Sequence, residues 1–279
     1  MPRRPEEPVP QIWTPLLAGF QRYVRWYLTR HVHGVRLSRA GSAPPQRSPE
    51  EPLVVYANHP SWWDPLIFLF LSHRFWPERS HYGPIDAEAA RRYGFFRRLG
   101  FFGVEQGTRA GARTFLETSS AILERPSTAL WITPQGDFTD PRNRPVRLEP
   151  GLVALARRLE RGTFVPLALE LPFWEEKLPE VLVRFGEPLE LAGPEGEVLR
   201  SRGDEGRELL ARRLEETQDA LALEARARRE DAFDPLLSGA AGPGGVYDLW
   251  RRLKARWRGE RFEPEHGSVK ATRQREKHP

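Results

Sequence analysis

The stretch "LVVYANHPSWWDPLIFLF", residues 53 to 70, decides the fold, because it joins two apolar runs through a short polar segment. Its first five residues are typical of a buried strand. The apolar residues from about 64 to 73 follow the spacing of a helix. If the helix begins at Pro60 or Ser61, His59 lies at the carboxyl end of the strand, where open α/β sheets bind their ligands. The stretch therefore predicts a strand, a site and a helix in succession.

The rest of the central region repeats this alternation. Strand-like runs recur at 128 to 133, 164 to 171 and 181 to 186, and helical periodicity occurs at about 86 to 99, 108 to 124 and 148 to 161. Such alternation predicts an α/β fold with a mixed, largely parallel sheet flanked by helices. Pro166 lacks the N–H that a sheet needs, so we expect its strand at an edge or a bulge.

The composition divides the chain into four segments. We expect an N-terminal amphipathic helix with a linker, a central core, a charged helical extension packed on or beside that core, and a linker with a basic helical tail; these cover residues 1–48, 49–192, 193–237 and 238–279.

The overall charge limits the possible partners. The 279 residues carry a net charge of +5, the sequence pI is about 9.8, and there is no cysteine. The missing cysteines exclude disulfides and thiolate catalysis. No recognisable nucleic-acid motif occurs, so we expect an anionic membrane surface, and no nucleic acid, as the partner. Because about 18 uncharged apolar residues never run together, we predict a peripheral protein on the cytoplasmic face of the membrane.

Two aromatic and basic segments, "IWTPLLAGFQRYVRWYL" from Ile12 and "YDLWRRLKARWRGERF" from Tyr247, have the spacing of interfacial helices. In such helices tryptophan and tyrosine lie at headgroup depth while arginine meets phosphate. Ordinary packing of both helices against the core is an equally good interpretation. On the interfacial interpretation the membrane contacts are Trp13, Phe20, Trp26, Tyr27, Trp250 and Trp257.

His59 and Asp64 have the spacing of a catalytic pair. A carboxylate in the first helical turn leans back toward the helix start, so Asp64 can reach the imidazole. The carboxylate then fixes one ring nitrogen, and the other takes a proton from an attacking group. We expect the attacking hydroxyl on a substrate and Ser61 as a helix cap. The alternative is a local hydrogen bond with no catalytic role. No metal-binding constellation is predicted.

The segment "NHPSWWD" matches the Asn-His-x-x-x-x-Asp signature of the glycerolphosphate and lysophospholipid acyltransferase superfamily, which the chain resembles over roughly residues 50 to 190. "ITPQGDF", residues 132 to 138, stands where that family has a glycine-rich third block, and "RLEPGLVALARR" and "FVPLAL" are similar to its later blocks. The resemblance implies transfer of a fatty acyl group from acyl-coenzyme A or acyl carrier protein to a lipid hydroxyl, with no other cofactor. It makes His59 the base and Asp64 its orienting partner.

The chain departs from the family where arginines bind phosphate. Gln106 falls on the arginine of the second block, and Phe138 stands where many members have another arginine. In the third block Gln135 replaces a glutamate and Asp137 a threonine. Neither glutamine nor aspartate replaces arginine at a phosphate. A small shift in the alignment would let Arg109 serve instead.

These departures predict a neutral, hydroxyl-rich acceptor, for example a carotenoid glucoside, because amide side chains suit sugar hydroxyls. The alternatives are a 1-acylglycerol-3-phosphate acyltransferase, a non-catalytic membrane-binding protein and a hydrolase that uses water. The expected substrate contacts are Asn58, Gln106, Arg109, Pro134, Gln135, Gly136 and Asp137.

Overall fold

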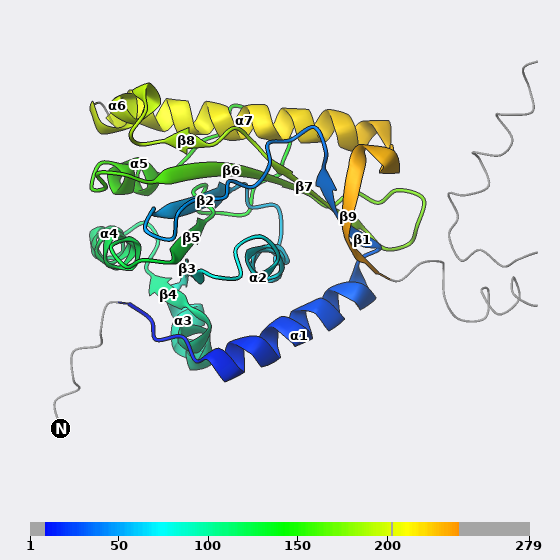
Figure 1. The fold of residues 1–279 in the computed structure, drawn as a ribbon, viewed down its shortest axis with the longest axis horizontal. Helices are drawn as coiled ribbons and strands as arrows, with labels where there is room; N and C mark the ends of the chain where they lie inside the picture. Colours follow the sequence, from blue (N-terminus) through cyan, green and yellow to red (C-terminus); the bar gives the residue numbers. More distant parts are fainter. Residues whose placement is uncertain (1–8, 202, 240–279) are drawn as a thin grey trace, which may run out of the picture.

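A computed structural model of the protein describes residues 9–201 and 203–239, which form a single mixed sheet flanked by helices (Figure 1). The sheet has nine strands in the order β4-β3-β5-β2-β6-β7-β1-β9, and β8 pairs with β6. The strands are β1 (Gly34–Ser38), β2 (Leu53–Ala57), β3 (Ser80–Asp86), β4 (Phe101–Val104), β5 (Thr128–Ile132), β6 (Thr163–Glu170), β7 (Glu180–Phe185), β8 (Leu189–Glu190) and β9 (Phe233–Ser238).

The strand directions place several carboxyl ends at one edge of the sheet. From β4 through β3, β5 and β2 to β6 every pairing is parallel. β7 and β8 pair antiparallel with β6, β1 pairs parallel with β7, and β9 pairs antiparallel with β1. The prediction of a mixed, largely parallel sheet is confirmed, and β2, β5 and β6 end side by side.

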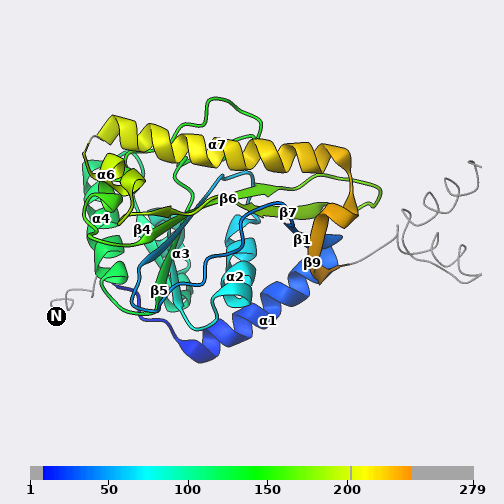
Figure 2. The same ribbon diagram turned by 45° about the horizontal axis from the view of Figure 1, so that its top comes forward.

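Helices cover both faces of the sheet. Alternate residues of β2 point to opposite sides: Val54 and Tyr56 pack with residues of α4 to α7, whereas Leu53 and Val55 pack with residues of α1 and α2. Figure 1 shows α7 along one face and α1 and α2 on the other, and Figure 2 shows the length of α7. The helices are α1 (Thr14–His31), α2 (Asp64–Phe75), α3 (Ala87–Arg92), α4 (Arg109–Leu123), α5 (Gly151–Ala156), α6 (Pro194–Ser201) and α7 (Gly203–Ala227), with 3-10 turns η1 (Gly94–Leu99) and η2 (Glu230–Ala232).

The position of Pro166 differs from the prediction. It lies on β6 in the interior of the sheet, opposite Tyr56 of β2. Its carbonyl accepts the N–H of Gly186 on the side of β7. A strand residue's nitrogen points to the same side as its carbonyl, so the missing N–H falls where the chain leaves β7 for β8. Of the two predicted settings, an edge or a bulge, the edge is therefore wrong. The pairing of β6 shifts by one residue between β7 and β8, and the proline lies at this shift.

Two strands lie in segments where we expected helix or linker. β1 follows α1 directly, and β9 comes after α7 and pairs with β1 at the edge of the sheet. The predicted helix at 148 to 161 is shorter, α5 (Gly151–Ala156), and the one at 86 to 99 divides into α3 and η1. Within residues 9–201 and 203–239, no helix combines the length and the apolar character needed to cross a bilayer.

Candidate active site

The loop from β2 to α2 brings His59 and Asp64 together. Nδ1 of His59 lies 2.7 Å from Oδ2 of Asp64, and the imidazole is 18% exposed while the carboxylate is fully buried. Ser61 adds two longer hydrogen bonds to the carboxylate, from its N–H and from its hydroxyl, each 3.3 Å. Burial raises the pKa of Asp64, and the hydrogen bond from His59 opposes this effect.

The start of α2 differs in detail from the expected one. The helix begins at Asp64, after a turn at residues 62 and 63, and not at Pro60 or Ser61. The hydroxyl of Ser61 accepts the N–H of Trp63 at 3.1 Å, so it stabilises that turn just before the helix. Asp64 is consequently the first helical residue, and its carboxylate faces back into the loop that carries His59.

The segment after β5 encloses the backbone of His59. The His59 N–H donates to Oε1 of Gln135 at 3.1 Å, and the His59 carbonyl accepts the N–H of Thr139 at 2.9 Å. The ring of Phe138 lies beside the imidazole, with 4.3 Å between centroids. The third block and the next residue, Thr139, therefore hold the backbone of His59 from both sides, and the His59 N–H bonds to the amide oxygen of Gln135.

Asn58 supports the same loop from the other neighbouring strand. Its side chain is fully buried, its amide donates to the carbonyl of Leu169 at 2.9 Å, and its amide oxygen accepts the N–H of Leu169 at 2.8 Å. The side chain thus continues the pairing of β2 with β6 for one residue beyond β2. We had expected Asn58 to bind substrate, but its polar groups are engaged with the fold.

The second and third blocks meet in the structure. The amide of Gln106 donates to the carbonyl of Gly136 at 2.8 Å. Gly136 has a φ of +82°, a conformation that favours glycine, so its backbone geometry explains this residue without any substrate. Asp137 and Arg109 are exposed, and Arg109 is the first residue of α4; Pro134 is buried.

Helix α7 holds the far end of the same loop. Glu215 accepts the N–H of Val146 at 2.7 Å, and Nε of Arg144 donates to Asp219 at 2.9 Å. Gln218 donates to the carbonyl of Pro141 at 3.1 Å. The sequence alone indicated no role for these residues beyond a charged, exposed helix face.

Arg142 and Arg144 of this loop are directed to carboxylates. The guanidinium of Arg142 makes two hydrogen bonds to Asp140, and Arg144 pairs with Asp219. Burial raises the pKa of Glu170 at the end of β6, and the nearby charges of Arg142 and Arg144 act in the opposite direction. These cations therefore already have anionic neighbours within the protein.

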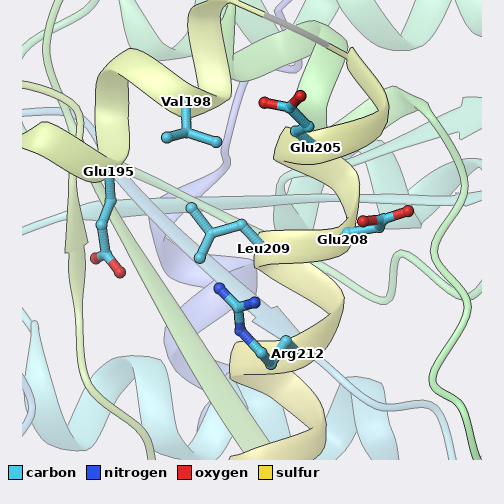
Figure 3. A pocket seen from close by; sticks show the side chains of 6 residues that line it. All are labelled: Glu195, Val198, Glu205, Glu208, Leu209 and Arg212. Atoms are coloured by element: carbon cyan, nitrogen blue, oxygen red, sulfur yellow. The ribbon is translucent and has the colours of Figure 1, made fainter.

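A separate cavity of about 320 Å³ lies between α6 and α7 (Figure 3). None of its lining residues contributes to the arrangement around His59, so we assign it no role in the site. It is lined by Glu195, Val198, Glu205, Glu208, Leu209 and Arg212. In the described segments of the chain, no group of three or more histidines and carboxylates is close enough to hold a metal ion.

The expected membrane contacts on α1 fall into two groups. Trp13 and Trp26 are exposed, whereas Phe20 and Tyr27 are partly buried. Val24 on the same helix is buried in the core. α1 therefore packs against the core and also presents aromatic rings to the outside. Trp250 and Trp257, in the predicted basic tail, lie outside the described residues.

The fold and this loop define an α/β protein with a histidine and carboxylate pair at the carboxyl edge of a largely parallel sheet. A family model described as Acyltransferase matches residues 30–170, just over half of the chain, and the chain belongs to this family. The predicted resemblance is confirmed: the protein is an acyltransferase, with an acyl donor and a lipid-type acceptor. No curated protein matches the sequence.

Proposed function

We propose that this acyltransferase uses His59 as the general base of O-acyl transfer. Asp64 holds Nδ1, so Nε2 is the nitrogen that accepts the proton of the acceptor hydroxyl. The hydroxyl oxygen forms a bond to the thioester carbonyl carbon, the carbon–sulfur bond breaks, and the proton on Nε2 is available to the leaving thiolate. The observation that carries this proposal is the 2.7 Å contact between His59 and the buried carboxylate of Asp64.

The acyl acceptor, on this proposal, is a neutral, hydroxyl-rich lipid such as a carotenoid glucoside. Phe138, and not a cation, lies beside the imidazole. The amide of Gln106 donates a hydrogen bond to the carbonyl of Gly136, and Arg142 is paired with Asp140. Acyl-coenzyme A or acyl carrier protein serves as the donor, with no other cofactor. The chemistry of the family supports this donor.

A second candidate is a 1-acylglycerol-3-phosphate acyltransferase. The observation that favours it is Arg109, which is exposed at the start of α4, three residues after Gln106. A guanidinium at this position suits a phosphate group better than any amide does.

We also propose that the enzyme works as a peripheral protein on the anionic cytoplasmic face of the membrane. Trp13, directly before α1, and Trp26 on it are exposed, and so are Arg22, Arg25 and Arg30 on the same helix. This combination is the one that interfacial helices use. A lipid-type acceptor partitions into the bilayer, so contact with the membrane brings it to the enzyme.

The test compares His59→Ala with His73→Ala, since His73 is an exposed histidine on α2. We expect His59→Ala to lower acyl transfer by at least about 100-fold, the usual contribution of a general base, while His73→Ala keeps wild-type activity. Retained activity in His59→Ala would reject the role of His59 as the general base. Turnover of lysophosphatidic acid alone would reject the neutral acceptor, and fatty acid release without any acceptor would indicate a hydrolase.

A further inference from the structure

Exposed aromatic side chains concentrate on one connected region of the molecule. Within residues 9–201 and 203–239, seven of the nine large apolar side chains that are exposed belong to α1, to the segment from α3 to η1, or to the loops around His59. Isolated exposed apolar residues are normal, but a contiguous group indicates an interaction surface. The seven are Trp13, Tyr23, Trp26, Trp62, Tyr93, Phe95 and Phe138.

Ring contacts join α1 and η1 into one surface, which we call the aromatic ridge and define as Tyr93, Phe95, Phe20, Tyr23, Trp26, Tyr27 and Trp63. Phe95 lies 6.2 Å from Phe20, and Phe20 lies 5.6 Å from Tyr23. Tyr23 in turn contacts Tyr27, whose ring is 5.6 Å from Trp63. The two elements are also bonded through their backbones, since the N–H of Trp13 donates to the carbonyl of Arg98 at 2.9 Å.

Arginines line the ridge along both elements. In "RRYGFFRR", residues 91 to 98, two arginine pairs bracket the aromatic rings, and three further exposed arginines lie on α1. The guanidinium of Arg92 lies 5.4 Å from the ring centre of Tyr93, and that of Arg30 lies 4.5 Å from that of Trp26. Apolar rings with cations at their margin match the boundary between acyl chains and anionic headgroups.

The ridge ends at the candidate active site. Trp63 is the residue before Asp64, and its neighbour Trp62 is 82% exposed. Trp62 contacts Phe138 with 5.0 Å between ring centroids, and Phe138 contacts His59. A bilayer that lies against the ridge is therefore next to the imidazole.

We propose that Tyr93 and Phe95 form a second membrane contact, which together with α1 seats the protein on an anionic bilayer with the His59 loop at the lipid boundary. This inference rests on the proposed membrane association and adds an element that the sequence had not indicated. Its partner is lipid and not an acidic protein donor, because the surface borders a site whose acceptor is a lipid, and it exposes apolar aromatic rings together with its arginines.

The experiment measures co-sedimentation of the full chain with vesicles of phosphatidylcholine that contain phosphatidylglycerol. The double variant Tyr93→Ser/Phe95→Ser is compared with Phe173→Ser, a change at an aromatic residue that is 62% exposed and does not belong to the ridge. We expect the double variant to partition roughly tenfold or more weakly, while Phe173→Ser partitions like the wild type. Thermal unfolding of each variant shows that the fold is kept. Arg92→Gln/Arg98→Gln should reduce the preference for anionic over pure phosphatidylcholine vesicles several-fold, since each basic residue near the surface contributes to it.

The outcomes separate this inference from the proposed function. If the wild type binds vesicles and the double variant binds equally well, the second contact is rejected while membrane association stands. If the wild type binds no vesicles, both are rejected. If the double variant keeps vesicle binding but loses binding to acyl carrier protein in the absence of lipid, the surface docks a protein and the lipid assignment is overturned.

Discussion

The ring of Phe138 lies beside the imidazole of His59, with 4.3 Å between the two ring centroids. An apolar ring at this position gives no charge to an anionic acceptor. It also shields one side of the imidazole from water. The choice of acceptor should therefore depend on this residue.

Phe138→Arg tests that dependence. A guanidinium beside His59 adds a charge-assisted hydrogen bond to phosphate, of about 1.5–3 kcal/mol, so kcat/KM for lysophosphatidic acid should rise roughly tenfold or more relative to a neutral glycolipid. Steady-state rates with both acceptors measure this ratio, and Phe138→Leu is the control for loss of the ring. An unchanged ratio in Phe138→Arg would show that the phosphate group does not bind beside this residue.

Asp64→Asn should separate activity from stability. The amide no longer holds the imidazole in the required tautomer, so kcat should fall by roughly 10⁴-fold. Burial raises the pKa of Asp64 above its ordinary value of 3.8. The stabilisation from this group is therefore complete below pH 3.8 and is lost as the pH rises through the raised pKa. At neutral pH the variant should therefore unfold at a temperature no lower than the wild type does. A clear loss of stability at neutral pH would contradict the direction of this shift.

The pair of His33 and Glu180 should make stability depend on pH. Its hydrogen bond to Glu180 raises the pKa of His33 above 6.5. Burial alone would raise the pKa of Glu180, but hydrogen bonds from His33 and Arg36 outweigh it and lower that pKa below 4.5. The stabilisation from His33 is complete below pH 6.5 and is lost as the pH rises through the raised pKa of His33. The stabilisation from Glu180 is lost as the pH falls through the lowered pKa of Glu180.

Urea unfolding of the wild type and of His33→Ala over a range of pH measures this effect. The difference in unfolding free energy should be largest between the two pKa values and should shrink on either side. His73→Ala, at an exposed histidine, should show a difference that changes little with pH. A flat difference for His33→Ala would show that the pair contributes no proton linkage.

Arg79→Lys should destabilise the fold although the charge is kept. The guanidinium is buried and donates to the backbone carbonyls of Glu51, Thr128, Arg47 and Ser48. Lysine has three donors on one atom and cannot reach all four, so we expect a loss on the order of 2–3 kcal/mol in unfolding free energy. Arg226→Lys, at an exposed arginine of α7, should change it by less than about 0.5 kcal/mol. Equal effects of the two changes would reject this role for Arg79.

The sequence predicts best where structure depends on neighbouring residues. The strand at 53 to 57 and the helix that follows have the predicted character, because an apolar run and its periodicity are local properties. β9 escaped prediction because "FDPLLS" contains a proline and becomes a strand only through pairing with β1, some 200 residues earlier. Edge pairing of this kind leaves almost no local signal.

The candidate site shows the same limit. The contact of His59 with Asp64 was predictable from a spacing of five residues. The bond of Glu215 to Val146 was not, because its two residues are 69 positions apart and a glutamate on an exposed helix has many possible partners. The hydrogen bonds of Asn58 to Leu169 could not be predicted either, because no sequence pattern distinguishes an amide that bonds to the backbone from one that binds a ligand.

The short passage from α1 to β1 restricts how the enzyme can reach its acceptor. Only Val32 and His33 separate the helix from the strand; both are buried, and His33 is bonded to Glu180. So short and buried a connection does not allow α1 to rotate relative to the sheet. On the proposed membrane association, the imidazole then works at a single fixed height above the acyl chains, so the length of the acceptor's headgroup, and not only its chemistry, selects which hydroxyl is acylated.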